Sequence, residues 1–323
     1  MVGVAATGVL VVVLDPTQVG GALARMRLIV IPPIIALYLG IYAFQGLRWH
    51  YLLRDAGVRL RIWDSLLVNA AGQTITAIVP LGDLTRAAFA SEAGGRDFGT
   101  VAATVTVQEL TFNLMLILCA LPMLLTIHLG VGIVIVTLIV MAGIVVILTV
   151  SPVFHVVHEV VAHIPLLKRL LPAIEELQTE TAELLHRPDA LGLSIFDLGR
   201  AVLSVLALWF VVQGLAPGRL NPEQAAFVLA LASIGGAISL LPGGVGANEA
   251  TVAGVLLVFG VSPGAAGAAA LIQRLLMTGV AIGFGLTSYL IVRRRLHLGG
   301  IFQVAHAGAP GEPLSRRVPA QPE

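Results

Sequence analysis

The stretch LLPGGVGANEATVAG, from Leu240 to Gly254, carries one proline, four glycines, an asparagine and a glutamate between two strongly apolar runs. Proline removes a backbone donor and tends to end a helix, and glycine allows a tight turn. Irregular backbone at membrane depth is tolerated only where protein or a water-filled cavity surrounds it. The stretch therefore predicts a helical hairpin within a membrane protein, with structural turn residues Pro242, Gly243, Gly244 and Gly246.

The composition of the chain supports this prediction. Of 323 residues, 57% are hydrophobic and 11% are charged, and the mean hydropathy is +0.95. Several apolar runs reach the ~20 residues that cross a bilayer. We expect an all-α polytopic membrane protein in which residues 1–298 form one integral membrane domain. The formal net charge is only +1 and no basic block is present, so we expect no nucleic-acid partner.

Apolar segments of two lengths follow one another along the chain. About six are long enough to cross the membrane, three are short or broken, and 152–191 reads as cytoplasmic amphipathic helices at the membrane interface. Residues 299–323 have the Gly, Pro and polar content of a disordered tail. The predicted crossings are 1–14, 28–47, 101–127, 131–150, 193–215 and 264–292, and the short segments are 65–79, 224–241 and 250–260.

Basic residues set the expected orientation. Arginines or lysines follow the second crossing, occur in the amphipathic stretch and follow the last crossing, so these parts and the C-terminus should be cytoplasmic. Counting the crossings then requires segment 65–79 to enter the membrane from the cytoplasm and return to the cytoplasm. It also requires segment 224–260 to enter the membrane from outside and return to the outside. Two opposed re-entrant hairpins result, one in each of the segments 65–127 and 224–292.

These two segments resemble each other. VPLGDLTRAAFASEAGGRDFGTVAATVTVQELTF, from Val79, and LPGGVGANEATVAGVLLVFGVSPGAAGAAALIQRLLM, from Leu241, each contain a Pro, a Gly, an acid, a run of small residues and a Gln next to a charge. Inverted repeats with broken helices near the midplane are a known transporter plan. The alternative is that small residues and Pro-Gly breaks are common in membrane helices in any case.

Glu109 and Arg274 each interrupt a long apolar run. A charge at the membrane centre costs at least ~2.5–3.5 kcal/mol on insertion scales, so each needs a partner or water. Their equivalent positions in the repeats lead to the hypothesis that they pair with each other; the alternative is that they contact a substrate. Amides beside them would satisfy remaining hydrogen bonds or line a polar cavity, namely Gln108, Asn113 and Gln273.

Each hairpin turn adds further candidates. In PLGDLTR, with turn residues Pro80 and Gly82, the i, i+3 spacing of Asp83 and Arg86 permits an intrahelical pair, or leaves Arg86 to receive a phosphate-bearing headgroup. In PGGVGANE, exposed N–H groups at the next helix start form an anion site, or a plain turn capped by Asn248 or Glu249.

Sites for metals, cofactors and covalent chemistry are not expected. Cys119 is the single cysteine, which excludes a disulfide framework and a cysteine-based zinc site. The stretch HVVHEVVAH, residues 155–163, reads as a solvated interfacial helix rather than a metal site. The chain carries no nucleophile elbow, P-loop or dinucleotide fingerprint.

Several motifs together resemble the lysylphosphatidylglycerol synthase transmembrane region, also called the UPF0104 group. They are LRWHYLL at 47–53, N-x-x-G at Asn69–Gly72, VPLGDLTR at 79–86 and LLPGGVGANEA at 240–250, followed by Arg274. The resemblance spans about residues 5–295. It implies a flippase-like plasma-membrane protein that moves a phospholipid or a polyprenyl-phosphate-linked lipid between leaflets, with an anionic or phosphate-bearing headgroup as ligand.

Two departures from the family pattern qualify this expectation. Gln108 and Glu109 stand where many members have an acid followed by arginine, so headgroup preference should differ. The chain also ends about where the synthases begin their soluble aminoacyl-transferase domain, so synthase activity is not expected. The alternatives are an intramembrane enzyme acting on lipid phosphates and an accessory subunit of a lipid, glycolipid or hopanoid pathway, with a lipid-modifying enzyme as partner.

Overall fold

The computed structural model describes residues 16–76, 83–126, 192–238 and 246–296, together with a few single residues between 132 and 179. Within these ranges the chain is all-helical and contains no strand, as predicted. Apart from those single residues, the predicted crossings 1–14 and 131–150, the amphipathic stretch 152–191 and the tail 299–323 lie outside the described residues.

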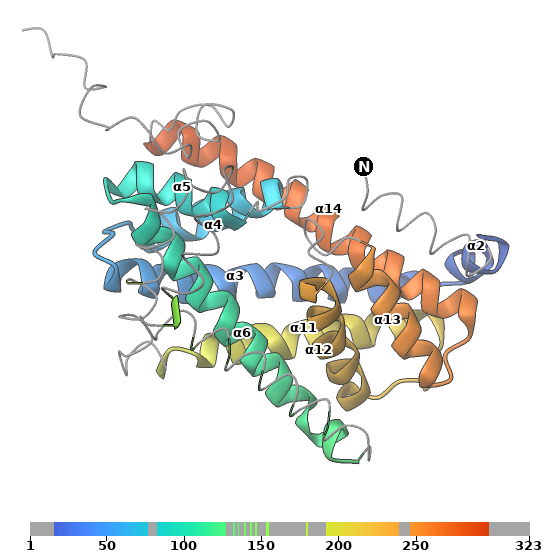
Figure 1. Cartoon of the computed structure of the whole chain (residues 1–323). Coiled ribbons are helices and arrows are strands. Elements are labelled where there is room, and N and C mark those ends of the chain that lie inside the picture. The colour runs from blue at the N-terminus through green and yellow to red at the C-terminus, as the bar shows by residue number, and fades with distance from the viewer. Residues whose placement is uncertain are drawn as a thin grey trace, which may run out of the picture.

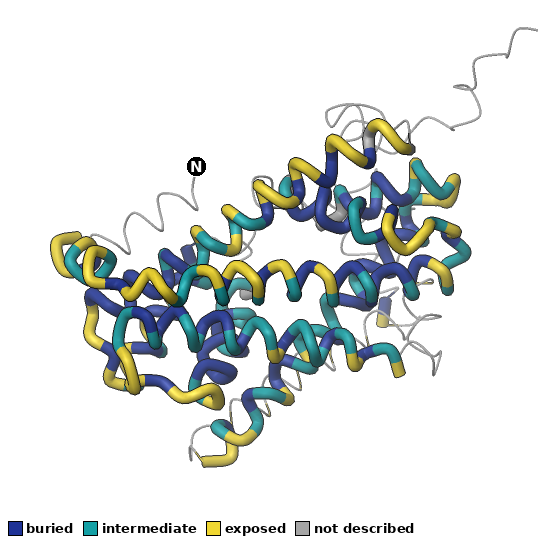
Figure 2. The backbone as a smooth tube through the Cα atoms, turned by 180° about the vertical axis from the view of Figure 1, so that it is seen from behind, coloured by how far each residue is buried: buried dark blue, intermediate teal, exposed yellow. Residues whose placement is uncertain are grey.

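Four long helices match four of the six predicted crossings. They are long and apolar enough to span a membrane, and η1 (Leu28–Val30) extends the first of them. Exposed and buried residues alternate along them (Figure 2), and large apolar side chains such as Leu118 and Leu275 are exposed, as lipid-facing surfaces require. These helices are α3 (Ile31–Asp55), α6 (Phe98–Thr126), α11 (Ile195–Leu215) and α14 (Pro263–Leu296).

The shorter helices form two hairpin-like pairs, and each of these helices is too short to span a membrane by itself. α4 and α5 precede α6, and α12 and α13 precede α14; a further short helix, α2 (Pro16–Ala24), packs against α14. The turn residues Pro80, Gly82, Pro242, Gly243 and Gly244 lie outside the described part. The short helices are α4 (Ile62–Thr76), α5 (Asp83–Gly94), α12 (Pro222–Ile238) and α13 (Ala247–Val258).

The two halves pack on each other reciprocally, as an inverted repeat requires. α4 runs antiparallel along α14, where the Thr74 hydroxyl donates to the Ala281 carbonyl at 3.1 Å. In the same way α12 runs antiparallel along α6, where the Ser233 hydroxyl donates to the Asn113 side chain. α3 and α11 lie against each other in opposite directions, and the two hairpins lie toward opposite ends of the molecule (Figure 1).

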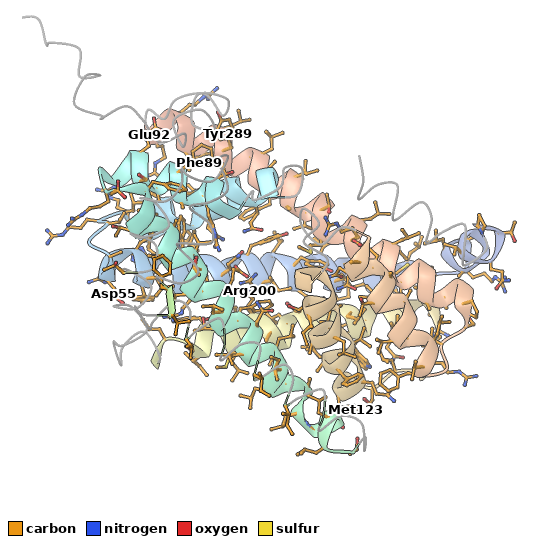
Figure 3. All side chains as sticks on the ribbon, viewed as in Figure 1. Asp55, Phe89, Glu92, Met123, Arg200 and Tyr289 are labelled. Atoms are coloured by element: carbon orange, nitrogen blue, oxygen red, sulfur yellow. The ribbon has the colours of Figure 1, made fainter. Side chains whose placement is uncertain are left out.

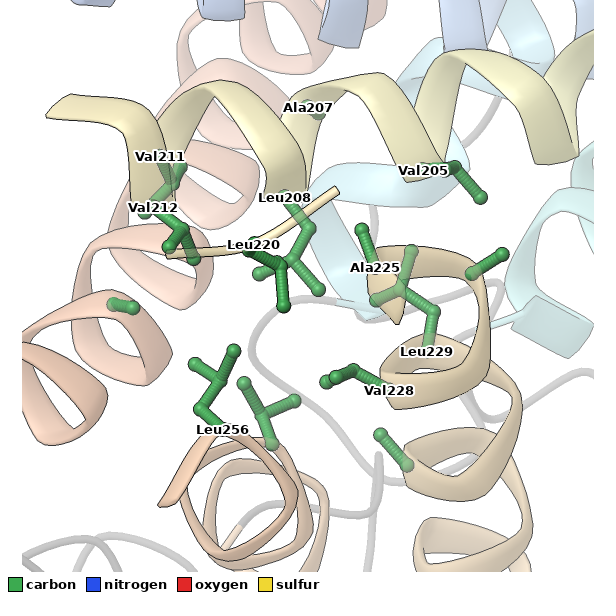
Figure 4. Close-up of a cluster of buried hydrophobic side chains, with 14 of the residues drawn as sticks. Val205, Ala207, Leu208, Val211, Val212, Leu220, Ala225, Val228, Leu229 and Leu256 are labelled. Atoms are coloured by element: carbon green, nitrogen blue, oxygen red, sulfur yellow. The ribbon is translucent and has the colours of Figure 1, made fainter. Parts of the chain in front are cut away.

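Among the described residues, the two larger apolar clusters of the core lie one beside each hairpin. The larger joins α11, α12 and α13 through side chains such as Leu208, Val228 and Leu256 (Figure 4). The smaller joins α5 to α3 and α14, and Phe89 contacts Tyr289 there. Between the apolar clusters, α3, α6 and α11 also bury polar side chains, namely Gln45, Arg48, Gln108, Thr111 and Asp197, which form a polar layer inside the bundle.

Candidate functional site

Arg86 of α5 is the centre of this polar layer. Its side chain is fully buried, and its Nη1 donates to Asn69 Oδ1 at 2.7 Å and to Gln108 Oε1 at 2.9 Å. Its Nη2 donates to Glu109 Oε1 at 3.0 Å. The guanidinium also lies 5.3 Å from the Trp49 ring centroid, a cation–π contact. Side chains of α3, α4 and α6 therefore surround one buried guanidinium group of α5.

The position of Arg86 depends on a glycine in α4. Because α4 and α5 approach closely, a Cβ on Gly72 would lie 2.5 Å from the Arg86 Cβ and 3.0 Å from its Cα. Asn69, one turn earlier on the same helix, reaches the guanidinium. The N-x-x-G motif thus has a physical role: the glycine admits the backbone of α5, and the asparagine receives the arginine that α5 carries.

A second arginine shares the carboxylate of Glu109. Arg200 of α11 donates from Nη1 to Glu109 Oε1 at 3.0 Å and from Nη2 to Oε2 at 3.3 Å, and its guanidinium lies 3.8 Å from the Phe112 ring centroid. The side chains of Glu109 and Arg200 are 30% and 12% exposed. Part of this charged group is therefore accessible from outside the bundle, unlike Arg86.

Amide side chains complete the hydrogen bonding around Glu109. Gln108 Nε2 donates to the Gln45 carbonyl oxygen at 2.7 Å, and Gln45 Nε2 donates to Glu109 Oε1 at 3.4 Å. Asn113 Nδ2 donates to the Glu109 carbonyl oxygen at 2.7 Å. The predicted residues Arg86, Gln108, Glu109 and Asn113 are thus brought together.

A buried ion pair lies one helical turn away. Arg48 of α3 donates from Nε to Asp197 Oδ2 at 3.1 Å, and Thr111 Oγ1 donates to the same oxygen at 2.6 Å. The Arg48 and Asp197 side chains are both fully buried. Because each ion is desolvated, removing either one strands the other.

The site carries excess positive charge. Arg86 and Arg200 share the single carboxylate of Glu109, which leaves one net positive charge among these three side chains. Within the described part of the chain, the buried Nε of Arg200 has no hydrogen-bond partner. The arrangement can therefore accept an anion. The same part of the chain holds no group of three His, Cys, Asp or Glu side chains that could bind a metal.

The second repeat holds a simpler polar pair. Glu249, in the first turn of α13, accepts from the backbone N–H of Gly246, whose φ of 92° favours glycine. Its Oε1 lies 3.5 Å from Nε of Arg274, a side chain that is 25% exposed. Asn248 Nδ2 reaches the Ala232 carbonyl oxygen at 3.5 Å, and the Gln273 carbonyl oxygen accepts from the Tyr38 hydroxyl at 3.2 Å.

These pairings correct one hypothesis. Glu109 binds Arg86 and Arg200, and Arg274 binds Glu249, so the hypothesis of a Glu109–Arg274 pair was wrong. Equivalent positions in an inverted repeat need not meet, because each residue turns toward the hairpin of its own repeat. The side chain of Asp83 lies outside the described residues.

Sequence reasoning passed over three participants, Arg48, Asp197 and Arg200. A signal was present for two of them, since IFDLGRAVL at 195–203 places an acid and a base inside an apolar run. Ionisable residues within membrane segments are functional candidates by default.

Comparison with known proteins assigns the family. No curated protein matches the chain at a significant level. A sequence model of the lysylphosphatidylglycerol synthase TM region matches residues 1–285, which is most of the chain. The protein therefore belongs to the family of the lysylphosphatidylglycerol synthase TM region, a membrane domain connected with lipid, as its motifs predicted.

Proposed function

We propose that the protein is a flippase-like translocator that moves a phospholipid or a polyprenyl-phosphate-linked lipid between the two leaflets. The observation that carries this proposal is that two arginines, Arg86 and Arg200, share the single carboxylate of Glu109 within long apolar helices. A lipid phosphate supplies the missing negative charge. Family membership supports a lipid-related role.

Exposure decides which arginine receives the headgroup. Arg86 and Arg48 are fully buried, whereas Arg200 is 12% exposed and shares the 30% exposed Glu109. Arginine binds phosphate through planar, paired N–H donors, and charge-assisted hydrogen bonds are the strong ones. We assign first contact with the phosphate to Arg200, while Glu109 holds both guanidinium groups when no lipid is bound.

The inverted repeat supplies the expected motion. In transporters of this plan, one repeat rocks against the other around a central site. Here the hairpin of each repeat packs against the long helix of the other repeat, because α4 lies on α14 and α12 lies on α6. When one repeat moves, its hairpin therefore moves along the long helix of the other repeat. The acyl chains remain in the bilayer throughout.

The proposal includes an orientation in the plasma membrane with a cytoplasmic C-terminus. Arg96 donates to the Gly57 carbonyl oxygen, and Arg295 binds Asp64 at 3.2 Å, so the basic residues near α3, α5 and the end of α14 gather at one end. Such clustering marks the cytoplasmic side. We propose no enzymatic activity and no cofactor; the partners are membrane lipids and an enzyme that produces the transported lipid.

Leaflet exchange in reconstituted vesicles tests this function. We expect a labelled phosphatidylglycerol to exchange faster in vesicles containing the protein than in empty vesicles. Arg200→Gln should slow this exchange at least about tenfold, because one charge-assisted hydrogen bond contributes ~1.5–3 kcal/mol. Arg86 still neutralises Glu109 in this variant. The matched control is Arg219→Gln, which changes an exposed loop arginine and should leave the rate unaltered.

Two results would contradict the proposal. Exchange no faster than in empty vesicles excludes translocation, and exchange undiminished by Arg200→Gln excludes the site. Formation of a new lipid product by the purified protein favours the intramembrane enzyme instead, and stable copurification with a lipid-modifying enzyme without exchange favours an accessory subunit.

A further inference from the structure

An apolar groove lies where α6, α11 and α12 meet, with a volume of about 240 Å³. Ligand pockets for compact molecules measure ~300–1,000 Å³, so the groove is too small for a lipid headgroup with its surroundings and suits part of a slender chain. The groove is lined by Cys119 of α6, by Val202, Val205 and Leu206 of α11, and by Pro222 and Ala226 of α12.

The groove and the charged group occupy the same two helices. Cys119 follows Glu109 by ten residues on α6, which corresponds to ~15 Å at 1.5 Å per residue. On α11, Arg200 precedes the groove residues Val202 and Leu206. Between the two features, Ser233 of α12 is hydrogen-bonded to Asn113 of α6. Figure 3 places Arg200 near the middle of the molecule and Met123 toward one end of α6.

The groove comes close to the charged group on α11. On α11 the separation is shorter, because Val202 follows Arg200 by two residues, which corresponds to ~3 Å along the helix. An acyl chain whose phosphate rests on Arg200 can therefore enter the groove at Val202 and continue toward Cys119 and Pro222. Polarity agrees with this direction: Glu223 is the single charged residue of the groove lining, which contains no cation for a phosphate.

We propose that this groove binds one acyl chain of the transported phospholipid while the phosphate contacts Arg200. This inference rests on the proposed function and adds to it a site for the hydrophobic part of the substrate. The chain site fixes the lipid beside the charged group, and it explains how a headgroup site open to the bilayer retains one lipid among many. The groove residues contribute apolar contact area for the acyl chain, and Arg200 contributes the positive charge for the phosphate.

Lipid retention in native mass spectrometry tests the groove. Purified protein in mild detergent is titrated with phosphatidylglycerol in competition with phosphatidylcholine. We expect wild type to retain one phosphatidylglycerol preferentially. Val202→Trp fills the groove from its rim, where Val202 is 42% exposed, and should lower this retention about tenfold, as expected for displacing about two buried methylene groups.

A matched variant separates the groove from general lipid contact. Leu118→Trp adds a ring to the residue before Cys119, at a position that is 51% exposed and does not line the groove. Its retention should equal that of wild type. Cys119→Phe fills the groove from the opposite wall, so it provides a second test if Val202→Trp fails to fold.

Glycerol phosphate distinguishes the chain from the headgroup, because it carries the phosphate without acyl chains. Its binding should be lost in Arg200→Gln and unchanged in Val202→Trp. Unchanged phosphatidylglycerol retention in both groove-filling variants overturns the inference, as does an equal loss in Leu118→Trp. A different outcome separates the two proposals. If the vesicles show no leaflet exchange, but phosphatidylglycerol retention is lost only in the groove variants, translocation is refuted and the acyl-chain site is retained.

Discussion

Glu109 and Arg274 hold the same place in two halves of the molecule but have different surroundings. Each is the twelfth residue of its long helix, and each follows a glutamine. Glu109 joins Arg86 and Arg200 beside a further buried ion pair, whereas Arg274 forms an ion pair with Glu249. The two positions therefore correspond in the helices but differ in charge, since two arginines meet Glu109 and one carboxylate meets Arg274.

The largest expected effect comes from Glu109→Gln. The change leaves two guanidinium groups close together without a carboxylate, and breaking a buried ion pair costs ~3–5 kcal/mol. We expect a strongly lowered midpoint of thermal unfolding, followed by circular dichroism in detergent. A loss no greater than that of Glu249→Gln would remove the asymmetry between the two halves.

Asp197→Asn tests the buried ion pair between Arg48 and Asp197. Because Arg48 is fully buried and loses the carboxylate that its Nε binds, we expect a loss of about 3 kcal/mol in the free energy of unfolding. The double change Arg48→Met with Asp197→Leu removes both charges and should recover most of that loss. If the double variant is as unstable as the single one, packing rather than charge explains the effect.

Gly72→Ala probes the contact that positions Arg86. The new Cβ meets the backbone of α5, and overpacking of this kind costs ~1–3 kcal/mol. We expect a lower unfolding midpoint together with slower leaflet exchange. Gly254→Ala in α13 is the control, because a Cβ there meets nothing within 4 Å, and it should stabilise the protein by ~0.5–1 kcal/mol.

The smallest effect is expected for Glu249→Gln. The amide oxygen still accepts from the Gly246 N–H, and Arg274 is 25% exposed, so the loss should be about 1 kcal/mol, as for a helix cap. The same thermal measurement applies. A loss of several kcal/mol would show that the second half also depends on its charges.

Much of the architecture follows from the sequence because it depends on composition along the chain. Runs of ~20 apolar residues specify the long helices, and Pro-Gly breaks mark the short pairs around α4–α5 and α12–α13. The motifs LRWHYLL, N-x-x-G, VPLGDLTR and LLPGGVGANEA, followed by Arg274, together predicted the family. Charges inside apolar runs identified Glu109 and Arg274 as residues in need of partners.

Which partners they find was decided by the tertiary structure. The direction in which a side chain leaves its helix, and the level at which two helices pass, depend on packing among segments far apart in the chain. Arg200 reaches Glu109 because α11 runs beside α6 in the same direction, and Arg86 reaches it because Gly72 lets α5 approach α4. The sequence by itself determined the helices, the breaks and the need for charge compensation, since these follow from local composition and the cost of burying charge. Only the packed fold determined that the compensation is unequal, because it brings two arginines from different helices to Glu109 and places Arg274 beside the carboxylate of Glu249.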